Sequence, residues 1–255
     1  MGKTNMNNID TNKVKLITKV LSREEDDYQK RLQQVCRLRY VEMINEYNQN
    51  TPEEGTDFDE YDKYCDHLVV IDEVSDKVVG TYRFILSEHI TNLDNKFLTE
   101  NEFNIDEVKK EGKILELGRA CVDKNYRNGS AITLLWKAAI KYAVEKEVRF
   151  MVGTASFHGV DAKPYEKTFK YLVQNYKSDY NCYAIGNICP IDISGEIVSK
   201  EEIVEMLPPL VKGYMRLGAK ISKDAYFDYD FNSTDILIII DIDNMDARYK
   251  ARFLK

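Results

Sequence analysis

The chain has 255 residues, of which 44% are hydrophobic and 31% are charged, and its formal net charge is −7. This composition excludes an intrinsically disordered chain, and its acidic excess argues against nucleic-acid binding, which needs lysine and arginine to neutralise phosphates. The longest purely apolar run, Ile236–Ile240, is far shorter than the roughly 20 residues of a membrane-spanning helix.

In chain order, the hydrophobic pattern predicts alternating strands and helices. We expect a strand at 13–21, a long amphipathic helix at 23–47, an acidic loop at 51–62, a β-hairpin at 67–86, an irregular stretch with a short helix at 97–111, a strand at 112–122, a helix at 132–147 and a central strand at 148–157. The last third predicts helices at 161–176, 201–218 and 243–255 and a buried strand at 235–242.

This order of elements is typical of an α+β fold with a mixed sheet flanked by helices. Neither an internal repeat nor a linker rich in proline and glycine divides the chain, so we expect a single domain over 1–255, elaborated from about residue 180 onward. The polar start of the chain lacks a signal segment, and the five cysteines form no CxxC pair. Both features favour a cytoplasmic protein with reduced thiols and no metal.

A polar turn with a glycine, within the stretch VDKNYRNGSAITLLW at 122–136, joins an expected strand to an expected helix. The unpaired N–H groups of a helix start and the helix dipole suit a phosphate. The residues that would form this cradle are Tyr126, Arg127, Asn128, Gly129, Ser130 and Ala131. An ordinary loop containing a glycine is the alternative, because such turns are common.

The same turn resembles the acyl-CoA-binding motif of the GNAT N-acyltransferases, in which Gln or Arg is followed by two residues, Gly, one residue, and Gly or Ala. Gly129 and Ala131 match, and Tyr126 departs from the motif. Further motifs in order resemble the ornithine N-acyltransferase family, whose members also carry the name hemolysin: CDHLVVID, VVGTYRFI, ILELGRACVDKNYRNG, GTASFHG, PPLVKGYMRLGAK and DFNSTDILIIIDID. That family is related to acyl-homoserine-lactone synthases and N-acyl amino acid synthases.

The resemblance implies a GNAT fold with a mostly antiparallel central sheet. It also implies transfer of a long acyl chain, with or without a 3-hydroxyl group, from acyl carrier protein to an amino acid amine, with ornithine as the leading acceptor and a lyso-ornithine lipid as product. The co-substrate would be the acyl-phosphopantetheine of acyl carrier protein or acyl-CoA, with no tightly bound cofactor. Alternatives are an acceptor such as glycine or an aromatic amino acid, a lactone-type signal synthase, and a non-catalytic, lipid-binding, hemolysin-like protein.

Aminolysis of a thioester needs a group that removes a proton from the amine. Glu116 is the candidate base, because its strand is apolar and burial raises a carboxyl pKa; a surface salt bridge is the alternative. Strand alternation would place Arg119 on the opposite face, unless a bulge at Gly118 brings the two together. The backbone N–H of Val122 is our candidate oxyanion donor.

Arg39 and Arg83 are candidates to bind the substrate carboxylate, and the resemblance to the lactone synthases favours this role over surface arginines. In the acidic loop, Asp57 and Asp59 match residues that help hold the amine in those relatives; a solvated loop is the alternative. An ornithine ammonium would need a carboxylate, and Asp228, Asp230 and Asp235 are available unless they serve as turn residues.

Three further candidates concern the substrate and its carrier. Ser156, with His158 beside it, follows the central strand and could donate a proton to the leaving thiol, or it is a polar strand end. The lysines Lys137, Lys141 and Lys146 could dock the acidic acyl carrier protein, although such a stripe is often a solvated face. The basic residues of 243–255 could contact anionic lipid at the inner face of a membrane.

Overall fold

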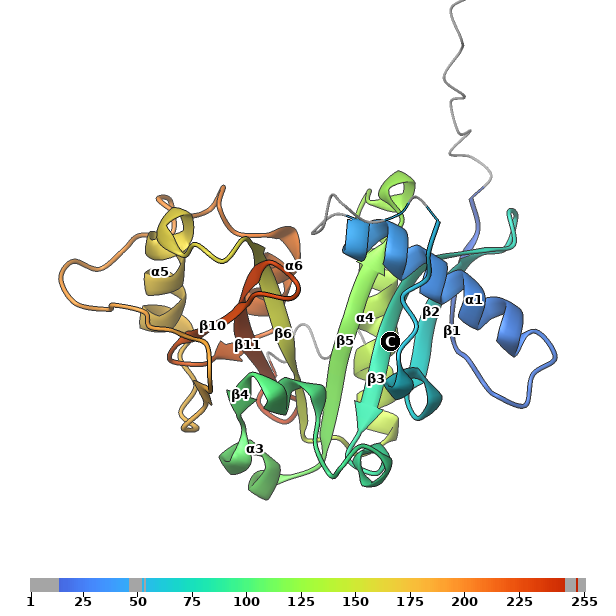
Figure 1. The fold of residues 1–255 in the computed structure, drawn as a ribbon, viewed down its shortest axis with the longest axis horizontal. Coiled ribbons are helices and arrows are strands. Elements are labelled where there is room, and N and C mark those ends of the chain that lie inside the picture. Colours follow the sequence, from blue (N-terminus) through green and yellow to red (C-terminus); the bar gives the residue numbers. More distant parts are fainter. Residues whose placement is uncertain (1–13, 46–51, 53, 246–250, 252–255) are drawn as a thin grey trace, which may run out of the picture.

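The computed structural model describes residues 14–45, 52, 54–245 and 251, and a nine-stranded mixed sheet runs through them (Figure 1). Its strands are β1 (Leu16–Val20), β2 (Asp66–Asp72), β3 (Lys77–Leu86), β5 (Ile114–Val122), β6 (Phe150–His158), β8 (Ile188–Cys189), β9 (Lys220–Ile221), β10 (Ala225–Asp228) and β11 (Ser233–Asp241). The order is β1-β2-β3-β5-β6-β11-β10-β8, with β9 paired to β11. A separate pair joins β4 (Phe103–Asn104) to β7 (Tyr183–Ala184).

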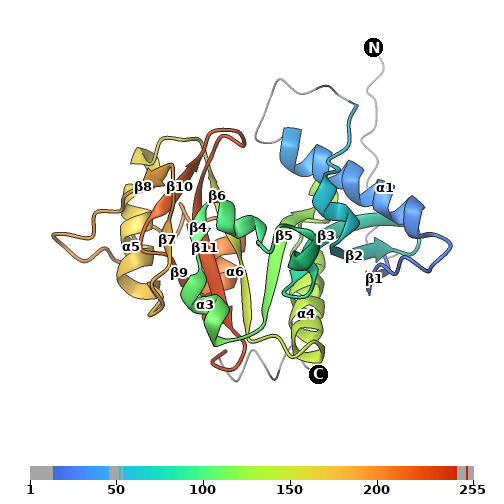
Figure 2. The same ribbon diagram turned by 60° about the horizontal axis from the view of Figure 1, so that its bottom comes forward.

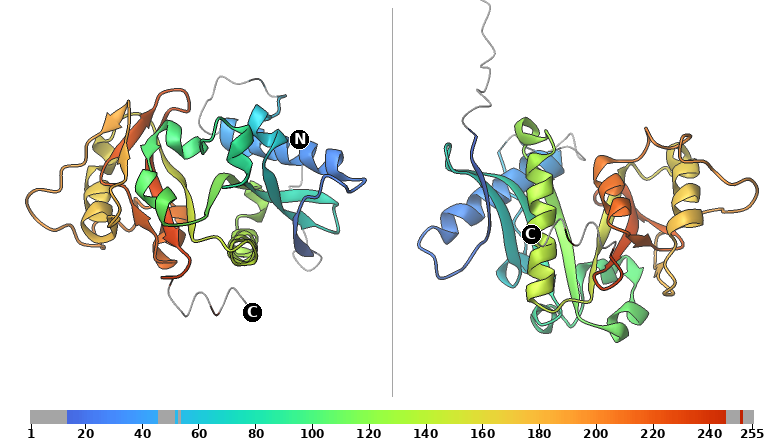
Figure 3. Two further views of the ribbon diagram at one scale, coloured as in Figure 1. Left: turned by 90° about the horizontal axis from the view of Figure 1, so that it is seen from below. Right: turned by 180° about the vertical axis from the view of Figure 1, so that it is seen from behind.

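Helices cover both faces of the sheet. They are α1 (Tyr28–Arg39), continued by a π-turn (Tyr40–Ile44), α3 (Asp106–Glu111), α4 (Ser130–Glu145), α5 (Glu166–Tyr176) and α6 (Pro209–Arg216). Short 3-10 turns are η3 (Glu60–Lys63), η4 (His89–Asn92), η5 (Leu98–Asn101), η6 (Lys124–Tyr126) and η7 (Lys163–Tyr165). Seen from behind, α4 and α6 lie on one face, whereas α1 lies on the other (Figure 3). Of the described helices, none is both long and apolar enough to cross a membrane.

Helix α4 packs on the sheet through small and apolar residues four positions apart, which share one face of a helix. The residues Ala131, Leu135, Ala139 and Ala143 are at most 2% exposed. Helix α6 approaches α4 closely at Gly213, where an added Cβ would lie 1.8 Å from the Trp136 ring. A glycine at this position therefore allows the two helices to cover the sheet side by side.

The sheet divides between β5 and β6, the parallel pair in an otherwise antiparallel arrangement. Their ladder has three residue pairs, from Ile114–Phe150 to Glu116–Val152, and the strands then diverge (Figure 1). The backbones are still close one residue later, because a Cβ on Gly153 would lie 2.3 Å from the Leu117 carbonyl oxygen. Divergence past this point opens a V in the middle of the sheet.

The predicted elements are largely confirmed, with two corrections at helix starts. The helix expected at 201–218 begins at Pro209, because proline disfavours helical geometry in the preceding residue and fits the first helical position. The helix expected at 23–47 is α-helical from Tyr28 to Arg39 and then widens into the π-turn. The expected helix at 243–255 lies mostly outside the described residues. All five cysteines are free and buried, as their spacing predicts.

Candidate active site

Glu116 occupies the last paired position of β5 before the strand leaves β6. The residue is 4% exposed, and its carboxylate accepts hydrogen bonds from the backbone N–H groups of Leu98 (2.9 Å) and Thr99 (2.7 Å) and from the Thr99 hydroxyl (2.6 Å). Burial raises the Glu116 pKa, and the three hydrogen bonds oppose that rise. A carboxylate offers about four acceptor sites, so these three hydrogen bonds leave one of them unused.

A β-bulge follows Glu116, as the chemistry of the site suggested, although it does not lie at Gly118. Gly118 pairs regularly with Arg83, and the next pair, Cys121 with Thr81, leaves two residues of β5 opposite one residue of β3. Arg119 takes the left-handed backbone conformation within the bulge, with a φ of 52°. The bulge turns Arg119 onto the face of the sheet that carries Glu116 and Arg83.

On that face, three arginines meet three aspartates in a charge-balanced cluster, which we call the Arg/Asp cluster. It consists of Arg39, Arg83 and Arg119 with Asp57, Asp59 and Asp62. Arg39 is 0% exposed and donates to both oxygens of Asp62, at 2.7 and 3.1 Å, and to Asp57 at 2.7 Å. The cluster fastens α1 and the 57–62 loop to β3 and β5.

Arg83 and Arg119 complete the Arg/Asp cluster from the sheet. Arg83 is 2% exposed and donates from Nη1 to both oxygens of Asp59 (2.7 and 2.8 Å) and to Asp62 (3.2 Å). The Arg119 Nε lies 3.0 Å from Asp57, and burial lowers the Arg119 pKa. Because the aspartates already engage all three guanidinium groups, a substrate carboxylate here would have to share or displace these contacts.

Asp62 is the central member of the Arg/Asp cluster, and the sequence did not single it out. The Asp59 and Asp62 side chains form the capping box that begins η3, each accepting a backbone N–H from the other residue. The three-residue spacing of these aspartates is the local signal that could have identified it. Burial alone would raise the Asp62 pKa, but the hydrogen bonds and charge of Arg39, with the charge of Arg83, lower it to about 2.

The phosphate turn expected at 126–131 is the exposed N-terminus of the 16-residue helix α4. Gly129 takes a φ of 94°, and an added Cβ would meet nothing within 4 Å, so the space in front of the turn is open. Asn128 accepts the Ser130 N–H at 3.0 Å, and Ala131 is buried. This geometry fits an anion at the helix start.

The flanking residues of the turn bind the protein itself. Tyr126 donates its hydroxyl to Asp72 at 2.8 Å and so points away from the turn. Arg127 donates to the Val122 carbonyl (3.0 Å) and to Glu42 (2.8 Å). Val122 lies directly beyond the bulge, opposite Gly80. The N–H of Val122 as an oxyanion donor stays a prediction.

The remaining predicted residues lie on the far side of the V. Ser156 pairs with Asp235 across β6 and β11, and both are on the face that carries Glu116. Asp230 is exposed in the turn between β10 and β11, where its N–H donates to Asp228. Asp228 and Asp235 converge instead with Glu102, a residue that the sequence did not indicate.

Comparison with known proteins agrees with this geometry. Residues 38–137 match the model of the "Acetyltransferase (GNAT) domain" family. An L-ornithine N(alpha)-acyltransferase of Agrobacterium fabrum is 33% identical over 228 residues, which cover 83% of this chain and 78% of the relative. The enzyme of the same name from Rhodobacter capsulatus is 29% identical over 86% of this chain and 89% of its own length.

Among solved structures, the CoA-dependent acyl-homoserine lactone synthase BjaI, with SAM and isopentyl-CoA, is similar in fold. Its TM-score is 0.52 at 12% identity, over 94% of this chain and 87% of BjaI. The family model and the curated relatives place the chain among the amide-forming acyltransferases of the GNAT class, and the divided sheet and the exposed start of α4 are consistent with that class. Within that class, the chain belongs to the family of the L-ornithine N(alpha)-acyltransferases.

Proposed function

We propose that the protein transfers a long acyl chain from a carrier thioester to the α-amine of ornithine, giving a lyso-ornithine lipid. The observation that carries this proposal is the position of Glu116, a buried carboxylate at the vertex of the V between β5 and β6. A thioester inserted into the V would bring its carbonyl carbon next to this carboxylate. The names of the relatives supply ornithine as the acceptor.

The reaction needs two proton movements. The ornithine α-ammonium first loses a proton to solvent, and the neutral amine attacks the thioester carbonyl. As the C–N bond forms, Glu116 takes the second proton, directly or through water, and the C–S bond then breaks to release the thiol. The backbone N–H of Val122 would bind the oxyanion, and Ser156 would supply a proton to the departing sulfur.

The donor would bind on the face of the sheet that carries α4 and α6, opposite to the face that carries the Arg/Asp cluster. The phosphopantetheine phosphate would bind at the open start of α4 around Gly129. The acyl chain would then enter the apolar space between β5, β6 and α6, which is lined by Leu117, Met151, Gly153, Thr154, Tyr214 and Ile238. We favour acyl carrier protein over acyl-CoA as donor, since Lys137 and Lys141 on α4 and Lys146 directly after it are exposed. Contact of residues 243–255 with a membrane remains a prediction on residues that are mostly outside the described part.

The test is amide formation from acyl carrier protein thioesters and free amino acids, followed by mass spectrometry. Glu116→Gln should lower kcat by about 100- to 10,000-fold, the usual contribution of a general base. Thr99→Val is the matched control, because it removes one hydrogen bond from the same carboxylate and keeps its charge. Equal losses in both variants would assign Glu116 to holding η5 in place. If the wild-type protein forms no amide from any pair, the proposal is wrong.

A further inference from the structure

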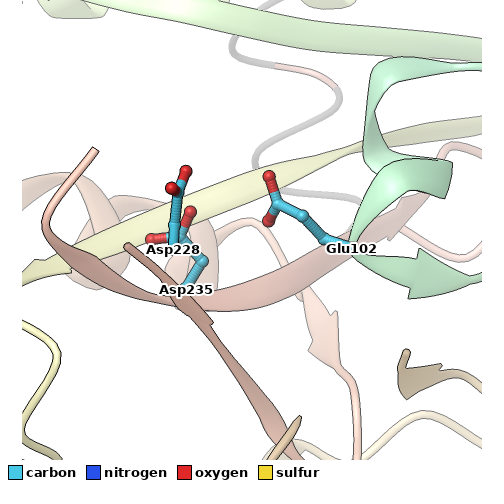
Figure 4. Close-up of side chains that lie close together, drawn as sticks. All are labelled: Glu102, Asp228 and Asp235. Atoms are coloured by element: carbon cyan, nitrogen blue, oxygen red, sulfur yellow. The ribbon is translucent and has the colours of Figure 1, made fainter. Parts of the chain in front are cut away.

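Three carboxylates from distant parts of the chain converge beside the V (Figure 4). Glu102 directly follows η5, Asp228 ends β10, and Asp235 lies in β11; we call them the carboxylate trio. One oxygen from each of the three lies within 4.8 Å of the others. Figure 2 shows that the segment with β4 and α3 lies alongside β6 and β11. Glu102, which directly precedes β4, thereby comes close to Asp228 and Asp235.

The carboxylate trio lacks the charge balance of the Arg/Asp cluster. Within the described part of the chain, no lysine, arginine or histidine forms an ion pair with any of the three. Asp235 is 3% exposed, whereas Glu102 and Asp228 are half-buried, and the polar neighbours of Asp235 are Ser156, Ser233 and Glu102. Asp235 Oδ1, Glu102 Oε2 and the Oγ of the buried Ser233 each lack a hydrogen bond of standard geometry. A buried carboxylate is costly unless it is paired, so the buried Asp235 with two half-buried carboxylates beside it points to a cationic ligand.

The titration of the carboxylate trio agrees with that geometry. Burial, and then the charges of Asp235 and Asp228, raise the Glu102 pKa to about 9. Burial is also the main cause that raises the Asp235 pKa to about 6. Near neutral pH the trio therefore retains a proton, which a bound cation would release.

The 3-10 turn η5 connects the carboxylate trio to Glu116. Its first N–H groups hold the Glu116 carboxylate, and Glu102 follows its last residue. A 3-10 helix rises about 2.0 Å per residue, so the four residues of η5 separate its ends by about 8 Å. The two amines of an extended ornithine are five bonds apart, about 6 Å once bonds of roughly 1.5 Å are projected along the zigzag chain, which is of the same order as the length of η5. The charge of Glu116 is also among the causes that raise the Glu102 pKa, so the two carboxylates lie near each other.

We propose that the carboxylate trio binds the side-chain ammonium of the acceptor amino acid, and so selects ornithine over neutral amino acids; this inference rests on the proposed function. A primary ammonium has three N–H donors and no acceptor, and each carboxylate of the trio accepts one of them. With the ammonium fixed there, the α-amine at the other end of ornithine reaches Glu116.

The experiment compares ornithine with norleucine, which has a methyl group in place of the ammonium. Asp235→Asn should raise KM for ornithine about 10- to 100-fold, the value of a hydrogen bond to a charged group, and leave KM for norleucine unchanged. Asp26→Asn is the matched control, because Asp26 is exposed before α1 and far from the trio. Asp235→Asn should also unfold at an unchanged or higher temperature, since it removes an unpaired buried charge.

Several results would overturn the inference. If the wild-type protein acylates ornithine and Asp235→Asn keeps the same preference for ornithine over norleucine, the ammonium assignment fails and the proposed function survives. If activity is lost in EDTA and returns with Ca²⁺ or Mg²⁺, the carboxylate trio binds a metal ion instead. If the wild-type protein acylates no amino acid, the proposed function itself fails.

Discussion

Removing the charge of Asp62 tests whether the Arg/Asp cluster is held together by this residue. Asp62→Asn keeps the shape of the side chain but leaves two buried arginines and the half-buried Arg119 facing two aspartates. The pKa of Asp62 falls from 3.8 to about 2 on folding. At about 1.4 kcal/mol per pKa unit, the charged form is worth about 2 kcal/mol more than a neutral one. Breaking a buried pair commonly costs about 3–5 kcal/mol, so we expect a loss of about 2–5 kcal/mol.

The loss is measured by urea unfolding at pH 7, with the control Asp26→Asn expected to change the free energy of unfolding by less than about 0.5 kcal/mol. The difference between wild type and Asp62→Asn should shrink as the pH falls from 3.8 toward 2. The reason is that Asp62 itself becomes protonated in the wild-type protein over that range. A loss below about 1 kcal/mol at pH 7, or one that does not depend on pH, would refute the central role of Asp62.

Two other predictions concern pH and the donor. The buried His67 has a pKa lowered from 6.5 to about 4, chiefly by burial, so wild-type stability should fall by about 3 kcal/mol as the pH drops from 6.5 to 4. His67→Gln should flatten that slope in unfolding experiments, and an unchanged slope would contradict the assignment. Charge reversal at Lys137 and Lys141 together should raise KM for acyl carrier protein thioesters and spare short acyl-CoA donors. Equal effects on both donors would remove the docking surface.

The sequence predicts the elements around the V well, because each has a strong local pattern. The apolar strand at 148–157, the helix after the glycine turn and the hairpin at 67–86 all appear within a few residues of the expected bounds. Local rules also account for the main error, since two consecutive prolines, Pro208 and Pro209, delay the start of α6.

The site is less predictable, because its key contacts are tertiary. Arg119 adopts the left-handed backbone conformation, and the neighbouring Gly118 does not. The register of β3 and β5 imposes this choice, whereas local preference would favour the glycine. Asp62 lies in a segment that resembles a solvated acidic loop until α1 covers it. Glu102 meets Asp228 and Asp235 from more than a hundred residues away, and neither spacing nor periodicity carries that information.

The short parallel ladder between β5 and β6 has a mechanical consequence. Three residue pairs join the two halves of the sheet there, whereas nine pairs join β6 to β11. Bending of the sheet should therefore concentrate at this narrow ladder. The half that holds the Arg/Asp cluster and the half that contains β6 and β11 would each move as a rigid body. The turn η5 connects the two halves, because its backbone N–H groups bind Glu116 of β5 and its end leads to Glu102 beside β11. An acceptor bound along η5 would therefore limit how far the two halves of the sheet can separate around the acyl chain.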